Sequence, residues 1–177
     1  GLQSSDLIIL AGRPGMGKTS LATNIAANIA AAYKPVQQAD GTFKAENGGV
    51  VGFFSLEMSA EQLATRIISE QTEISSSKIR RGEITESEFE KLVVQSQQMQ
   101  KLPLYIDQTG GISIAQLAAR ARRLKRQRGL DVLVIDYVQL MQGSSAKASQ
   151  NRVQEITEIT TGLKALAKEL SVPIIAL

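Results

Sequence analysis

The sequence predicts an α/β fold in which a mostly parallel central sheet carries helices on both faces. Five short apolar runs are too short for stable helices, and most are rich in Val and Ile or bounded by Gly and Pro, as buried strands are. Longer helical patterns separate these runs. Strands that alternate with helices of this length form parallel sheets whose two faces are both covered.

The elements follow one another in a regular order. The expected strands are residues 7–11, 50–55, 104–107, 132–136 and 173–177. The expected helices are residues 18–33, 59–73, 85–102, 113–128 and 151–170. The first helix is rich in Ala. The second opens with "SAEQ", in which Ser59 and Gln62 form a capping box, and the third opens with "TESE", another such box.

Residues 34–49, "KPVQQADGTFKAENGG", are polar and contain an Asp-Gly turn signal. We expect these residues to form a hairpin on the surface of the domain. No role can be assigned to it from the sequence.

Composition limits the chemistry. A chain of 177 residues with 43% hydrophobic residues suits one domain, which we expect to span residues 1–177. The chain has no Cys and no His, which excludes disulfides, thiolate or histidine metal sites and a Ser-His-Asp triad. The net charge of +3 permits a polyanionic partner without requiring one. No segment approaches the ~20 apolar residues that span a bilayer.

Both ends of the chain look cut. It begins without Met and ends on the apolar run "VPIIAL" with no turn after it. We therefore expect a piece of a longer protein.

The most informative motif is "GRPGMGKT" at residues 12–19, which fits the phosphate-loop pattern G-x-x-x-x-G-K-[ST] between a strand and a helix. Glycines let the backbone approach a phosphate closely, and the amides of residues 15–20 would point at the anion at the positive end of a helix dipole. Lys18 would reach the β- and γ-phosphates, and the Thr19 hydroxyl would bind Mg²⁺. The expected nucleotide-binding residues are Gly12, Arg13, Pro14, Gly15, Met16, Gly17, Lys18, Thr19 and Ser20.

Two acidic residues follow strands whose carboxyl ends should meet at the same edge of the sheet. Asp136 ends the run "DVLVID" and could hold Mg²⁺ through water beside the phosphate loop. Glu57, in "GFFSLEMS", is the candidate base that orients a hydrolytic water, since no His is available. The alternative for Glu57 is an acid that only favours the start of a helix.

The segment "DQTG" at residues 107–110 matches the D-x-x-G of a GTPase switch, but the chain has no Asn-Lys-x-Asp motif for guanine. We therefore expect ATP as the nucleotide and a strand-to-loop turn at this segment.

Four segments together carry a family resemblance, and they cover nearly the whole chain: "GRPGMGKTSLATNIA", "GFFSLEMSAEQLATRI", "DVLVIDYVQLM" and "NRVQEITEITTGLKALAKELSVPIIAL". The chain resembles the motor domain of DnaB-type replicative DNA helicases. The resemblance implies a RecA-like P-loop NTPase fold and an ATP- and Mg²⁺-dependent motor that translocates 5′ to 3′ on single-stranded DNA and unwinds duplex at the replication fork. It assigns Lys18 and Thr19 to the nucleotide, Glu57 to catalysis and Asp136 to Mg²⁺.

The resemblance also implies partners. The family works as a homohexameric ring in the cytoplasm of bacteria, within the replisome at the nucleoid, where it meets primase and a helicase loader. Its arginine finger and sensor would follow residue 177. We therefore expect this piece alone to hydrolyse ATP weakly. The competing interpretations are a RecA-like recombinase or another RecA-fold ATPase without unwinding activity, a non-hydrolysing nucleotide-dependent module, and a small-molecule kinase.

Two basic segments are candidates for DNA contact. By resemblance, residues 142–152, "QGSSAKASQNR", face the central channel, where Lys147 and Arg152 could follow a phosphate backbone; the alternative is an ordinary surface loop. The run "ARARRLKRQRG" at residues 119–129 carries six cations. Since Leu117, Ala121 and Leu124 share one helix face, we expect most of these charges to be solvated or to contact another subunit, with DNA as the alternative.

Overall fold

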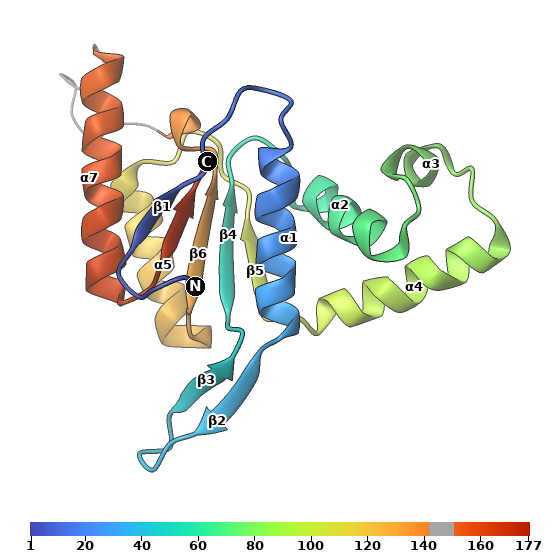
Figure 1. Ribbon diagram of the computed structural model, residues 1–177, viewed down its shortest axis with the longest axis horizontal. Helices are drawn as coiled ribbons and strands as arrows, with labels where there is room; N and C mark the ends of the chain where they lie inside the picture. The colour runs from blue at the N-terminus through green and yellow to red at the C-terminus, as the bar shows by residue number, and fades with distance from the viewer. Residues whose placement is uncertain (142–150) are drawn as a thin grey trace.

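The computed structural model describes residues 1–141 and 151–177, and it confirms the predicted α/β architecture (Figure 1). A five-stranded sheet has the order β1-β7-β6-β4-β5, and every neighbouring pair in it is parallel. Its strands are β1 (Leu7–Ile9), β4 (Val51–Ser55), β5 (Leu104–Asp107), β6 (Val132–Asp136) and β7 (Ile174–Ala176).

Helices cover both faces of this sheet, as the alternation of strands and helices predicts. The described helices are α1 (Lys18–Ala31), α2 (Ala60–Thr72), α3 (Ser76–Arg81), α4 (Glu86–Gln100), α5 (Ile114–Arg128) and α7 (Arg152–Leu170), with the short 3₁₀ helix η1 (Val138–Leu140) after β6. One apolar core lies between the sheet and α1, and the other lies between the sheet and the pair α5 and α7. Helices α3 and α4 extend to one side of the sheet (Figure 1).

Small residues bring α1 close to the sheet. Ala22, Ala26 and Ala30 recur at every fourth position and are almost completely buried against β4 and β6. Helix α1 therefore lies tightly against the centre of the sheet, and its first turn is held at the edge where the strands end.

Register brings the carboxyl ends of the central strands together. Phe54 pairs with Ile135 and Ser55 with Asp136 between β4 and β6, and Ile135 pairs with Ala176 between β6 and β7. Each of these strands is buried along its whole length. The segments that follow these strands therefore all begin at the carboxyl edge of the sheet. Helix α1 begins at the same edge (Figure 1).

The capping boxes at Ser59 and Thr85 are both present, and a third joins Ser113 and Gln116 at the start of α5. The expected hairpin is also present. It consists of β2 (Lys34–Gln37) and β3 (Phe43–Asn47), and Asp40 accepts a hydrogen bond from the amide of Thr42 at 2.9 Å in its turn. The hairpin lies at the amino ends of the parallel strands, away from the edge described above (Figure 1).

Helix α3 was not predicted. It has six residues, none of them buried, so the sequence shows no apolar periodicity there. Its start is capped by Ser75, and an ion pair of 2.9 Å between Lys78 and Glu88 joins it to α4. Within the described ranges 1–141 and 151–177, the helices are all too short or too polar to cross a membrane.

Candidate functional site

The loop of residues 12–17 lies between β1 and α1 and has the backbone of an anion-binding turn. Gly15 and Gly17 have φ angles of 79° and 81°, in the left-handed region that glycine adopts without a Cβ clash. Among the described residues, no side chain caps the start of α1, and its first turn holds no acid. The first amides of α1 are therefore available to an anion, which the positive end of the helix dipole would also attract.

Lys18 is held over this loop. Its ammonium group donates a hydrogen bond of 2.8 Å to the carbonyl oxygen of Gly12. A Cβ atom at Gly12 would lie 3.4 Å from Cδ of Lys18, so the lysine stem packs along the glycine backbone. The charged head is therefore held at the phosphate loop itself, where a phosphate group would bind.

Asp136 ends β6 as a buried carboxylate. The residue is 2% exposed, and its Oδ2 atom has no hydrogen-bond partner within the described part of the chain. Burial raises the pKa of Asp136 above its ordinary value. The hydroxyl of Thr19 acts against this by hydrogen bonding to the carboxylate, while the negative charge of Glu57 raises the pKa further. Both Thr19 and Glu57 therefore lie close enough to Asp136 to affect its pKa.

These residues fit a magnesium ion that is shared with a phosphate. A buried carboxylate oxygen without a donor is costly, and a cation or its bound water would satisfy it. Among the residues that the structure describes, no three His, Cys, Asp or Glu side chains cluster to hold a metal by themselves. Mg²⁺ commonly takes one or two carboxylates and completes its shell with water and phosphate oxygens. Asp136 and the Thr19 hydroxyl would provide the protein side of such a shell.

Glu57 lies on the turn between β4 and α2, residues 56–59, which we call the Glu57 turn. The hydroxyl of Ser55 donates to the carbonyl of Met58 at 2.7 Å, and the amide of Leu56 donates to the carbonyl of Asp136 at 2.7 Å. The turn is thus bonded directly to the end of β6. The Glu57 side chain is exposed and lines a cavity.

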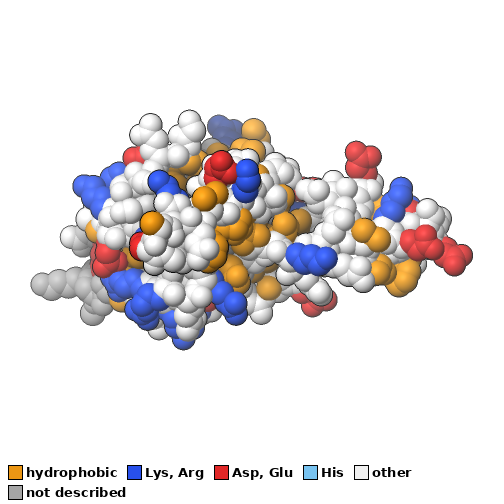
Figure 2. Space-filling view, turned by 90° about the horizontal axis from the view of Figure 1, so that it is seen from below, with side chains coloured by type: hydrophobic (Ala, Val, Ile, Leu, Met, Phe, Trp, Pro, Cys, Tyr) orange, Lys and Arg blue, Asp and Glu red, His pale blue; other side chains and the backbone are white. Residues whose placement is uncertain are grey.

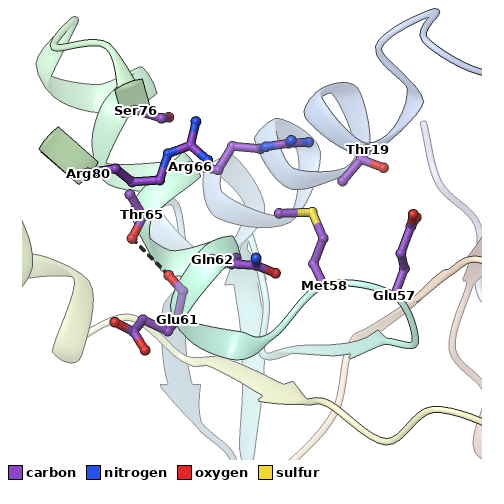
Figure 3. Close-up of a pocket in the computed structure, with 9 residues that line it drawn as sticks. All are labelled: Thr19, Glu57, Met58, Glu61, Gln62, Thr65, Arg66, Ser76 and Arg80. Atoms are coloured by element: carbon purple, nitrogen blue, oxygen red, sulfur yellow. Dashed lines mark hydrogen bonds between the residues drawn. The ribbon is translucent and has the colours of Figure 1, made fainter. Parts of the chain in front are cut away.

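This cavity has a volume of about 640 Å³ and adjoins the start of α1. Thr19 and Glu57 lie at one end of it, and Arg66 of α2 and Arg80 of α3 extend into it from the other (Figure 3). The guanidinium of Arg66 points toward Thr19 in this view, and its charge lowers the pKa of Asp136. The cavity therefore combines a carboxylate with positive charge next to the phosphate loop.

Sequence reasoning missed both arginines. Arg66 follows Gln62 by one helical turn and lies beside the buried positions Leu63 and Ile67, so the pattern of α2 could have marked it as a residue at the edge of a site. Arg80 belongs to α3, which leaves no apolar pattern in the sequence.

Of the two candidate DNA contacts, Lys147 and Arg152, the structure describes only Arg152. Lys147 lies outside the described residues. Arg152 begins α7, where its Nη1 atom is 3.0 Å from Oε1 of Glu155 and its Nη2 atom donates to the carbonyl of Gln139. Part of the hydrogen-bonding capacity of Arg152 is therefore already used within the chain.

Most of the cations in the basic run at residues 119–129 lie on the exposed side of α5. Figure 2 shows Lys and Arg side chains gathered at the end of the molecule away from α3 and α4. Three of the six cations have partners on other elements: Arg120 pairs with Asp107, Arg122 with Glu169, and Lys125 donates to the carbonyl of Leu170. These bonds favour a structural role for half of the run.

Comparison with known proteins gives a consistent result. The family model described as the DnaB-like helicase C terminal domain matches residues 1–177. The chain is 48% identical over 177 residues to a protein of Rickettsia typhi named replicative DNA helicase DnaB, and 44% identical to the protein of that name from Geobacillus stearothermophilus. It is covered completely in both matches but spans only 34% and 36% of these relatives, about a third of their length.

Two solved structures resemble the chain along its whole length. One is described as an ATPase domain, with a TM-score of 0.83, 29% identity and 58% of that chain covered. The other is described as a DnaB-like replicative helicase and its interactions with primase, with a TM-score of 0.78, 28% identity and 39% of that chain covered. The fold is therefore that of a RecA-like helicase ATPase domain, as the sequence predicts.

Proposed function

The chain belongs to the DnaB-like helicase C terminal domain family, and from this premise we propose that it is the ATP-hydrolysing motor of a replicative DNA helicase. The proposal rests on the way in which three features of the site come together. The free start of α1, the buried Asp136 carboxylate and the exposed Glu57 carboxylate all lie at the edge where β4 and β6 end.

The phosphate loop would hold the nucleotide. The amides of residues 15–20 surround the phosphate groups, and the ammonium of Lys18 leaves the carbonyl of Gly12 to neutralise the terminal phosphates. Thr19 and Asp136 would hold Mg²⁺, Asp136 through a water molecule. When bound, this ion offsets the negative charge that develops on the phosphate oxygens.

Glu57 would act as the general base. Its turn is bonded to the end of β6, so the carboxylate stays near the Thr19 side of the cavity. There it can orient a water molecule for attack on the terminal phosphate and accept its proton. Arg66, whose guanidinium points toward Thr19, would place positive charge beside the same phosphate (Figure 3).

The partners follow from the family. We propose that the full-length protein forms a homohexamer on single-stranded DNA and contacts primase and a helicase loader. The related structure described together with its interactions with primase supports the primase contact. Relatives named as replicative helicases favour unwinding over the alternative of a RecA-like recombinase.

The test is ATP hydrolysis and fork unwinding by the full-length protein. We expect hydrolysis that single-stranded DNA stimulates and unwinding of a forked duplex. Hydrolysis without any unwinding would favour the recombinase alternative. Nucleotide binding without phosphate release would favour a non-hydrolysing module.

A further inference from the structure

The segment of residues 107–110, "DQTG", forms the strand-to-loop turn that the sequence predicts. It follows β5 and lies against the Glu57 turn. The side-chain oxygen Oε1 of Gln108 accepts a hydrogen bond from the backbone amide of Ala60, the first residue of α2. A Cβ atom at Gly110 would lie 3.5 Å from the carbonyl oxygen of Leu56, so the two segments are in contact at a second point.

Arg120 fixes this segment from α5. Its Nη1 atom lies 2.8 Å from both carboxylate oxygens of Asp107 and 2.6 Å from the hydroxyl of Thr109. The Thr109 hydroxyl also donates to Asp107 at 2.9 Å. Asp107 itself ends β5 in register with Phe54 of β4. The segment is thus tied both to the sheet and to α5, with Gln108 in its middle.

The bond from Gln108 completes the start of α2. The Ser59 hydroxyl accepts from the amide of Gln62 at 3.1 Å, and the Gln62 side chain accepts from the amide of Ser59 at 3.1 Å. This capping box leaves the amide of Ala60 without a partner on its own helix. Gln108 accepts from it. The amides of Ser59, Ala60 and Gln62 at the start of α2 are therefore bonded to side chains, whereas the start of α1 has no side-chain cap.

We propose that Gln108 is a positioning residue for hydrolysis, holding the Glu57 turn in place through Ala60, and that Arg120 holds Gln108 through Asp107 and Thr109. This inference rests on the proposed role of Glu57 as the base. Gln108 is not among the residues that line the cavity beside the phosphate loop. It acts because Glu57 lies three residues before Ala60, on a turn whose end toward α2 is fixed by this bond.

The test uses full-length protein with Gln108→Met, which keeps the size of the side chain but removes the acceptor. We expect the kcat for ATP hydrolysis to fall roughly tenfold, because a small misplacement of a catalytic group is costly. The KM for ATP should stay within about twofold, since the phosphate loop is untouched. Gln108→Glu keeps an acceptor and suits the start of a helix, so it should restore kcat to within about twofold.

Gln97→Met, on the exposed side of α4, is the matched control and should leave kcat and KM unchanged. Arg120→Lys should reproduce the fall in kcat, and its effect should not add to that of Gln108→Met, because both act through one segment. Unchanged kcat in Gln108→Met, failure of Gln108→Glu to restore it, or a KM that rises as kcat falls would overturn the proposal.

A second measurement does not depend on activity. Hydrogen exchange in the nucleotide-free protein should be faster at residues 56–63 in Gln108→Met than in the wild type, while β6 is unchanged. If the wild type does not hydrolyse ATP, the proposed function fails, but this measurement still decides whether Gln108 fixes the turn. Unchanged exchange at residues 56–63 would overturn the structural step itself.

Discussion

Ser55 and Asp136 are register partners at the carboxyl ends of β4 and β6. Two residues beyond Ser55 the chain reaches Glu57, and the amide of Leu56 between them is bonded to the carbonyl of Asp136 at 2.7 Å. A carboxylate that can orient water and a carboxylate that can hold Mg²⁺ are therefore placed by the same pair of strands. Their relative position depends on sheet register and on the bonds that hold the Glu57 turn.

Glu57→Gln tests the catalytic role of this pair. The amide keeps the shape and hydrogen bonding of the side chain but cannot accept a proton. We expect ATP to bind as in the wild type, while hydrolysis falls by ~10²–10⁴-fold, the usual contribution of a general base. Nucleotide binding by fluorescence and phosphate release would be measured together. If the variant lost affinity for ATP but hydrolysed the ATP that it did bind at the normal rate, Glu57 would be structural.

Lys18→Ala tests the phosphate loop. Removing the ammonium leaves the charge of the terminal phosphates without its partner, so hydrolysis should become undetectable and ATP binding should weaken by about tenfold or more. Isothermal titration and phosphate release would measure the two effects. Lys44→Ala, on the exposed strand β3, is the control for removal of a lysine and should behave as the wild type. Normal turnover in Lys18→Ala would refute the assignment.

The pKa of Asp136 predicts how stability depends on pH. Burial, the largest cause, raises this pKa in the folded state above the ordinary value of 3.8. The contribution of such a group to the free energy of unfolding is fully present below its ordinary pKa and is lost as the pH rises through the raised one. At neutral pH the buried charge therefore destabilises the nucleotide-free protein.

Asp136→Asn should accordingly raise the Tm of the nucleotide-free protein at neutral pH by roughly 2–4 °C, about the shift that 1 kcal/mol produces in a domain of this size. The gain should shrink as the pH falls and should vanish below 3.8, where Asp136 becomes protonated in both the folded and the unfolded state. The same variant should lose Mg²⁺-dependent hydrolysis. Calorimetry across pH would measure the first effect. A lower Tm for the variant at neutral pH would show that the carboxylate is stabilised by groups other than those named here.

The fold could be predicted because its signals are local. Strands β4 and β6 are five buried residues each, and capping boxes at Ser59 and Thr85 mark where helices begin. The phosphate loop could also be predicted, since Gly15 and Gly17 serve a backbone conformation that few other residues adopt.

The rest of the site depends on contacts between distant segments. Arg80 reaches the cavity only because α3 packs beside α2, and nothing in its six residues, none of them buried, indicates this. Arg120 looks like one cation in a basic run, yet its partner is Asp107 at the end of another strand. Charge patterns identify a surface, but only the tertiary structure shows which charges are paired.

Gly48→Ala tests how the hairpin joins the domain. Gly48 has a φ of 58°, and a Cβ atom there would lie 2.5 Å from backbone atoms of Ala32 and Tyr33 and would also meet the carbonyl oxygen of Ile29. Backbone atoms cannot move aside as a flexible side chain can. We expect the free energy of unfolding to fall by ~3 kcal/mol in urea titrations.

Gly41→Ala is the matched control. Gly41 also has a positive φ but has open space around it, so this variant should lower the free energy of unfolding by only about 1 kcal/mol. Equal decreases would show that the close approach at Gly48 is relieved by movement.

Lys147 and Arg152 are the candidate contacts to the DNA backbone. Lys147→Ala combined with Arg152→Ala in the full-length protein should weaken binding to single-stranded DNA equally for all sequences, because phosphate contacts carry no base information. The slope of log affinity against log salt should become less steep by roughly 0.7 for each phosphate that is no longer neutralised. Arg152 already bonds Glu155 and the carbonyl of Gln139, so Arg152→Ala alone should change the slope only if its guanidinium also reaches a phosphate. Fluorescence anisotropy from low to high salt would measure this, with Lys44→Ala as control. An unchanged slope and affinity in the double variant would assign both residues to the ordinary surface.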